Sequence, residues 1–116
     1  MSEAEARLFL IEIKSLISQG RRDFITRWYN LPNGKRIRYT EALLSIGLTS
    51  IQQAWDEILK LKPRDYFKGP NPDRDRPNDG SQVWEFKKEV NGIQTYIKLK
   101  IDHRGCVCMS FHEDWS

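Results

Sequence analysis

The chain has 116 residues, of which 19 are Lys or Arg and 16 are Asp or Glu, so its formal net charge is +3. This length predicts a single domain spanning residues 1–116, because domains usually contain roughly 100–200 residues. It excludes a doubly wound nucleotide-binding fold joined to a substrate domain. No apolar run approaches the ~18 residues of a membrane span, so we expect no membrane partner. Glu3 and Glu5 stand where a signal peptide has its basic start, so we expect a cytoplasmic protein.

The first half of the chain predicts three helices. The first is expected over residues 3–19, because its apolar side chains recur at helical spacing and Gly20 is a suitable end. Thr40 is a candidate N-cap for a short second helix. Thr49 starts a capping-box pattern, so we expect a third helix from this residue to a point before Pro63.

The last third of the chain predicts an antiparallel sheet. Asn91-Gly92 is a strong hairpin signal between two alternating segments, residues 82–90 and 93–102. A third strand is expected over residues 106–111. Residues 69–80 hold three prolines and two glycines, so we expect a loop without regular structure there. Together these elements predict an α+β fold, in which a C-terminal antiparallel meander carries helices packed on one face.

Side chains alternate along a strand, so both faces of this sheet can be assigned from the sequence. The apolar face is expected to carry Trp84, Phe86, Val90, Ile93, Ile97, Leu99, Ile101, Val107, Met109 and Phe111. The polar face is expected to carry Glu85, Lys87, Tyr96, Lys98, Lys100, Ser110 and His112, together with Cys106 and Cys108. Two cysteines one residue apart on one face do not suit a disulfide, so we expect reduced thiols.

Turn lengths predict the register of the three strands. The last turn, read as three residues over 103–105, pairs Asp102 with Cys106. On the polar face the predicted pairs are Glu85 with Lys98, Lys87 with Tyr96, Ser110 with Lys98, and His112 with Tyr96. This register keeps apolar residues opposite apolar residues, and it brings the polar side chains close together.

The polar face combines a carboxylic acid, a phenol, an imidazole and amines. Such a set can cleave RNA without a metal: a base removes the proton of a ribose 2′-OH, which attacks the adjacent phosphate, and an acid protonates the leaving oxygen. The alternative is the solvated face of a half-exposed sheet. We expect no metal or cofactor. Asp73-x-Asp75 with Asp79 lacks the bidentate Glu of a calcium loop, and a single Cys106-x-Cys108 pair is a poor zinc motif.

Four motifs in a fixed order identify a family. They are Asp65-Tyr66-Phe67-Lys68-Gly69-Pro70, Trp84-Glu85-Phe86, Tyr96-Ile97-Lys98-Leu99-Lys100 and Ser110-Phe111-His112-Glu113. Over residues 47–113 the chain resembles the MqsR (motility quorum-sensing regulator) family of toxins from bacterial type II toxin–antitoxin systems. The resemblance implies a RelE-like fold and a metal-independent endoribonuclease (mRNA interferase) that cuts mRNA and arrests growth. It also implies a cognate antitoxin protein as partner.

The resemblance implies the catalytic residues Lys68, Glu85, Tyr96 and His112. Glu85 stands where the best-known pattern has Gln, and His112 where it has Lys. Our hypothesis makes His112 the general acid or base, with Lys68 stabilising the phosphorane or the leaving group. Tyr96 would position the phosphate or share the proton transfer, and Glu85 is a second acid or base candidate. The RNA-binding candidates are Lys87, Lys98 and Arg74 or Arg76. The alternative function is a non-catalytic RNA- or protein-binding module on the same fold.

Overall fold

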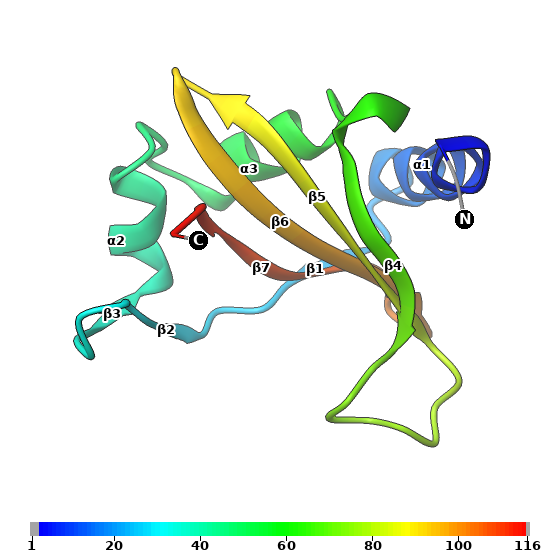
Figure 1. Cartoon of the computed structure of the whole chain (residues 1–116). Helices are drawn as coiled ribbons and strands as arrows, with labels where there is room; N and C mark the ends of the chain where they lie inside the picture. Colours follow the sequence, from blue (N-terminus) through cyan, green and yellow to red (C-terminus); the bar gives the residue numbers. More distant parts are fainter. Residues whose placement is uncertain (1–2, 116) are drawn as a thin grey trace.

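The computed structural model describes residues 3–115 and has an α+β fold, in which helices cover one face of a β-sheet (Figure 1). The helices are α1 (Glu3–Ser18), α2 (Tyr39–Leu44) and α3 (Ile51–Ile58), followed by a 3₁₀ turn over Pro63–Asp65. The strands are β1 (Arg22–Phe24), β2 (Trp28–Asn30), β3 (Arg36–Arg38), β4 (Tyr66–Pro72), β5 (Gln82–Val90), β6 (Ile93–Asp102) and β7 (Gly105–Glu113). Within the described chain, no helix is long and apolar enough to cross a membrane.

The three predicted helices are present, and two of them start at other residues than predicted. The N-cap of α3 is Ser50, whose hydroxyl accepts a hydrogen bond from the Gln53 amide at 3.2 Å. The predicted cap, Thr49, lies one residue earlier, and its amide donates to the Gln53 side chain. Helix α2 begins at Tyr39, so Thr40 lies within its first turn and is not its N-cap. The N-cap residues are instead Arg38 for α2 and Ser50 for α3, and both have the extended backbone conformation typical of this position.

The main sheet has the strand order β1-β7-β6-β5-β4, and β2 and β3 form a separate hairpin. The predicted meander is confirmed, because β5, β6 and β7 are antiparallel neighbours and Val90 pairs with Ile93. Asn91 and Gly92 between them both have positive φ, as a type I′ turn requires. The sequence predicts an antiparallel sheet, but β1 runs parallel to β7, so the complete sheet is mixed. Three residues are too few for a strand alternation to be visible in the sequence.

Strand β4 corrects the prediction that residues 69–80 lack regular structure. The strand continues through Gly69 and ends at Pro72, so the loop begins only at Asp73. Proline is tolerated here because β4 is an edge strand, where an amide facing away from the sheet has no ladder partner. Gly69 has φ of 115°, and a Cβ there would lie 2.6 Å from the carbonyl oxygen of Val83. Glycine therefore allows β4 to approach β5 closely.

A β-bulge in β7 corrects the predicted faces of this strand. Asp102 pairs with Gly105, not with Cys106, so the turn contains two residues. Further along, Lys98 pairs with Ser110 whereas Leu99 pairs with Cys108, so β7 holds one extra residue there. The bulge cancels the shift at the turn, and the predicted pairs of Ser110 and His112 are therefore correct. Between turn and bulge the faces are exchanged: Cys106 and Cys108 face the helices, and Val107 and Met109 lie on the opposite face with Val83.

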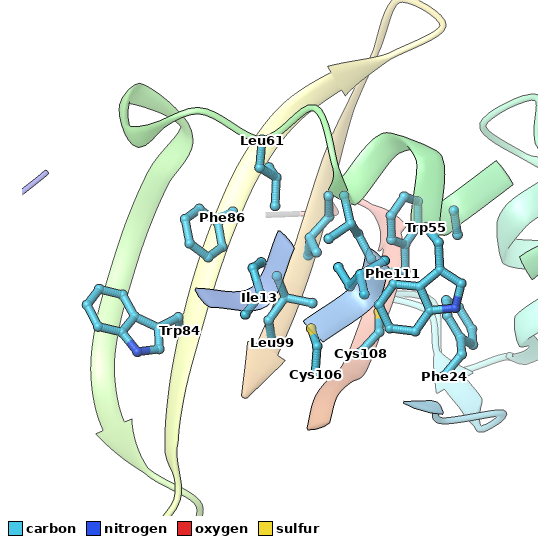
Figure 2. Close-up of a cluster of buried hydrophobic side chains, with 14 of the residues drawn as sticks. Ile13, Phe24, Trp55, Leu61, Trp84, Phe86, Leu99, Cys106, Cys108 and Phe111 are labelled. Carbon is cyan, nitrogen blue, oxygen red and sulfur yellow. The ribbon is translucent and has the colours of Figure 1, made fainter. Parts of the chain in front are cut away.

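The main core lies between the helices and one face of the sheet (Figure 2). Ile13 of α1, Phe86 of β5 and Phe111 of β7 have no exposed surface. The ring of Trp84 stacks on Phe9 with 4.9 Å between centroids, so Trp84 is a core residue and does not form a base-stacking platform. Figure 2 shows both cysteine side chains within this cluster. The opposite face of the sheet is therefore the one available for a site.

Because Cys106 and Cys108 face the core, we predict that their thiols are unreactive in the folded protein. Burial raises the pKa of Cys106 to about 12 and that of Cys108 well above its ordinary value. Since only the thiolate reacts with disulfide reagents, we expect no labelling at neutral pH until the chain is unfolded in denaturant. A Glu12→Cys variant, with its new thiol on the exposed side of α1, should react at once and serves as the control. Rapid labelling of the native chain would contradict the observed faces of β7.

Candidate functional site

A cleft of about 630 Å³ lies on the face of the main sheet that the helices leave uncovered. We call it the main cleft. Its lining residues are Lys68, Asn71, Pro72, Asp73, Arg74, Asp75, Pro77, Val83, Glu85, Tyr96 and Lys98. They come from β4, β5, β6 and the loop between β4 and β5, which projects at the end of the sheet in Figure 1. The sheet forms the floor of the cleft, and this loop forms one wall.

Strand pairing places charged groups in a line across the floor of the main cleft. Glu85 of β5 pairs with Lys68 of β4 on one side and with Lys98 of β6 on the other. Residues paired directly across antiparallel strands have Cβ atoms about 5 Å apart. Among residues 3–115, neither amine has an ion-pair partner within 4 Å. A carboxylate therefore lies between two ammonium groups that remain available to an anion.

Tyr96 holds the carboxylate of Glu85. Its hydroxyl donates a hydrogen bond of 2.6 Å to Glu85 Oε1. Burial and this hydrogen bond to a carboxylate raise the pKa of Tyr96 far above its ordinary value, so the phenol stays protonated. Glu85 Oε2 accepts no hydrogen bond from the part of the chain that the structure describes. One carboxylate oxygen is thus fixed, and the other is left to accept a proton.

An irregularity in β4 brings two successive side chains to the same face. Tyr66 pairs with Phe86 and Lys68 with Glu85, so β4 advances two residues while β5 advances one. Tyr66 packs against the core, whereas Phe67 and Lys68 both face the uncovered side of the sheet. Regular alternation would have turned one of them away. The bulge therefore adds an aromatic ring beside the line of charges.

Lys100 anchors the loop that walls the main cleft. It is only 1% exposed, and its ammonium group lies 2.7 Å from Asp73 and 3.4 Å from Asp79. Ser81 and Asp102 lie 3.2 and 3.5 Å from the same nitrogen. Burial alone would lower the pKa of Lys100, but its hydrogen bonds to these carboxylates raise it above the ordinary value. Two of the three aspartates that faintly resemble a calcium loop in the sequence, Asp73 and Asp79, therefore bind a lysine.

A second, smaller pocket adjoins the main cleft at Tyr96, which lines both. We call it the aromatic pocket; it measures about 280 Å³ and is lined by Phe67, Lys87, Tyr96, His112, Asp114 and Trp115. The ammonium group of Lys87 lies 3.0 Å from Asp114 and 4.0 Å from the centre of the Phe67 ring. The ring of His112 stacks on that of Trp115, with 4.1 Å between centroids and 8° between planes.

The surroundings of His112 favour the neutral form of its ring. Burial lowers its pKa, against the smaller opposing effects of the Glu113 carbonyl and the charge of Asp114. His112 Nδ1 lies 2.7 Å from the Glu113 carbonyl oxygen. Since a carbonyl only accepts, Nδ1 carries the proton and Nε2 keeps a lone pair. The edge of Tyr29 contacts the same imidazole, with 4.6 Å between centroids, so His112 is held within a group of rings.

The structure divides the predicted site residues among three places. Lys68, Arg74, Glu85, Tyr96 and Lys98 line the main cleft. Lys87 and His112 line the aromatic pocket instead, although His112 pairs with Tyr96 as predicted. Arg76 lines neither of them; it lines a third pocket of about 240 Å³, which shares Asp73 and Asp75 with the main cleft.

Sequence reasoning missed three residues of the aromatic pocket: Phe67, Asp114 and Trp115. Phe67 depends on the β4 bulge, which leaves no signal in the sequence. Trp115 could have been found from its distance of three residues from His112, just after the last strand.

No family model matches the chain, and no curated protein and no solved structure is significantly similar to it. Within residues 3–115 no group of three or more His, Cys, Asp or Glu side chains is placed to hold a metal ion. The chemistry of the main cleft is therefore the basis on which a function can be argued.

Proposed function

We propose that this chain is an endoribonuclease of the MqsR type, a toxin that cuts mRNA in the cytoplasm without a metal ion. The supporting observation is the composition of the main cleft. Three of the four residues that the motif resemblance names as catalytic, Lys68, Glu85 and Tyr96, line one cleft together with the further cations Lys98 and Arg74. These residues come from three strands and a loop, and each has a use in cleaving a phosphodiester.

In the proposed reaction, Glu85 is the general base. Its free oxygen removes the proton of a ribose 2′-OH, and that oxygen forms a bond to the adjacent phosphorus. The ammonium groups of Lys68 and Lys98, on either side of Glu85, stabilise the charge of the pentavalent phosphorane. The bond from phosphorus to the 5′-oxygen then breaks, and Lys68 donates a proton to that oxygen. The products are a 2′,3′-cyclic phosphate and a 5′-hydroxyl.

In this proposal Tyr96 and His112 have supporting roles. The Tyr96 hydroxyl orients Glu85, and its raised pKa keeps the proton on the phenol. His112 was the leading acid or base candidate from the sequence, but it lines the adjoining pocket and its ring is enclosed by Tyr29 and Trp115. We therefore assign it to the wall of that pocket and make Glu85 the leading base.

The amines of the main cleft suit the phosphate backbone of a single-stranded RNA. An antitoxin with an acidic segment could occupy the same cleft and silence the enzyme, because carboxylates would replace the phosphates. We therefore propose an antitoxin protein of this kind as the cognate partner. Its binding should compete with RNA.

The decisive experiment is an RNA cleavage assay with EDTA present. The purified chain should cut a labelled mRNA and leave cyclic phosphate ends, and a Lys68→Ala variant should lose this activity. Equal cutting by both proteins would point to a contaminating nuclease and would overturn the assignment of the cleft. Binding of RNA without cutting, also with ribosomes supplied, would favour the non-catalytic binding module.

Salt dependence tests the proposed backbone contacts. Each phosphate contact to single-stranded RNA contributes a slope of about 0.7 when log Kd is plotted against log salt. A Lys98→Ala variant should therefore weaken binding and lower this slope by about 0.7. A Lys60→Ala variant is the matched control, because this lysine is exposed on the far side, just after α3. An unchanged slope in Lys98→Ala, measured by fluorescence anisotropy, would remove Lys98 from the RNA path.

A further inference from the structure

The aromatic pocket differs in chemistry from the main cleft that it adjoins. Its walls are mostly rings, whereas the main cleft is lined mainly by charged and polar groups. Phe67 is 49% exposed, which is unusual for a ring of this size and leaves much of it open to solvent. Trp115 is partly exposed, with the ring of His112 on one side of its indole. Lys87 lies over one face of the Phe67 ring, yet much of the surface of this ring stays open to solvent.

The two charged residues of the aromatic pocket neutralise each other. Lys87 and Asp114 form an ion pair of 3.0 Å at its edge. Within the described residues, the ammonium group of Lys87 is therefore already paired with a carboxylate, unlike those of Lys68 and Lys98 in the main cleft. The pocket offers an ammonium donor and a carboxylate acceptor beside the rings, which match the donors and acceptors on the edge of a nucleobase.

The position of the pocket indicates what enters it. Tyr96 lines both the pocket and the main cleft. Its two cross-strand partners, Lys87 on β5 and His112 on β7, both line the pocket. An RNA whose backbone lies on Lys68 and Lys98 has its bases within a short distance of this wall. In single-stranded RNA the bases are free to turn outward and stack on protein rings.

We propose that the aromatic pocket binds one unpaired nucleobase of the RNA whose backbone occupies the main cleft. This inference rests on the proposed function, since it takes RNA as the ligand of the cleft. The base stacks on Phe67 or Trp115, and Lys87 and Asp114 contact its edge. Binding of the base fixes the adjoining ribose over Glu85, so the pocket contributes to the choice of the bond that is cut.

A binding experiment with uncleavable RNA tests the pocket separately from catalysis. The probes are a short 2′-O-methyl oligonucleotide and the same backbone with its bases removed. The native chain should bind the complete oligonucleotide about tenfold more tightly, because stacking of one base on a ring contributes an effect of this order. Phe67→Ala and Trp115→Ala should lose most of this preference and keep the salt slope of the native chain. Trp115→Phe should retain the preference, and Leu8→Ala on α1 is the control for an exposed apolar residue.

The outcomes separate the two proposals. The base pocket would be overturned if the native chain bound both probes equally, or if Phe67→Ala and Trp115→Ala both kept the full preference. A protein partner would then be the better candidate ligand of the aromatic pocket. A base preference that depends on these rings, found in a chain that cuts no RNA, would uphold the pocket and overturn the nuclease. Thermal melting of each variant verifies that it is folded.

Discussion

Replacing Glu85 by Gln should lower the rate of RNA cleavage by about 10²–10⁴-fold, the usual contribution of a general base. Glutamine has the same shape and can still accept the hydrogen bond from Tyr96, but its amide cannot take the proton of a 2′-OH. Binding should be preserved within a few-fold, because the amines around Glu85 remain. The rate is measured in single-turnover cleavage and the affinity by anisotropy with 2′-O-methyl RNA.

Glu89→Gln is the matched control, because Glu89 is exposed near the end of the same strand. Its cleavage rate should equal that of the native chain. A Glu85→Gln variant that cuts at the native rate would contradict the mechanism and return His112, with its free Nε2, to the role of base. A variant with lost binding as well would show that Glu85 supports the RNA site and not the chemistry.

The sequence predicts the centre of this fold well, because its determinants are local. Asn91-Gly92 dictates the hairpin, and the hairpin dictates that Glu85 lies opposite Lys98 and Lys87 opposite Tyr96. Alternation along β6 then places Tyr96 and Lys98 on the face away from the helices. These steps use only neighbouring residues, and each of them is confirmed by the structure.

The failures arise where one extra residue or a distant contact decides the geometry. The bulges in β4 and β7 insert single residues, and a bulge has no required residue type outside special turns. They decide that Phe67 faces the site and that Cys108 faces the core. Lys100 pairs with Asp73, which is 27 positions away in the sequence. Alternation along β6 correctly placed Lys100 on the polar face, but a local pattern could not show that this distant contact buries it. The turn before β7 was predicted one residue too long and the bulge in β7 was not predicted. These two errors cancel, so the predicted pairing of His112 with Tyr96 is correct.

Lys100 is the residue on which the loop around the main cleft depends most. A Lys100→Met variant would leave the buried carboxylate of Asp73 without its counter-charge, and the loss of one partner of a buried pair costs about 3–5 kcal/mol. We expect a decrease of this size in the free energy of unfolding, measured by urea denaturation at neutral pH. Lys98→Met is the matched control, because Lys98 lies two residues away on the same face and is half-buried without an ion pair in the described chain. Its effect should stay within about 0.5 kcal/mol.

The pH dependence identifies the cause of that loss. In the native chain the hydrogen bond from Lys100 lowers the pKa of Asp73 below its ordinary value. A lowered carboxyl pKa contributes stability that is present above the unfolded value of about 4 and is lost as the pH falls through the folded value. Without Lys100 the burial of Asp73 should raise the pKa of its carboxyl group instead. Protonation of Asp73 in acid then removes the buried unpaired charge of the variant, whereas acid lowers the stability of the native chain. The difference in unfolding free energy between Lys100→Met and the native chain should therefore shrink below about pH 4. A difference that does not change with pH would attribute the loss to packing of the lysine stem and not to its charge.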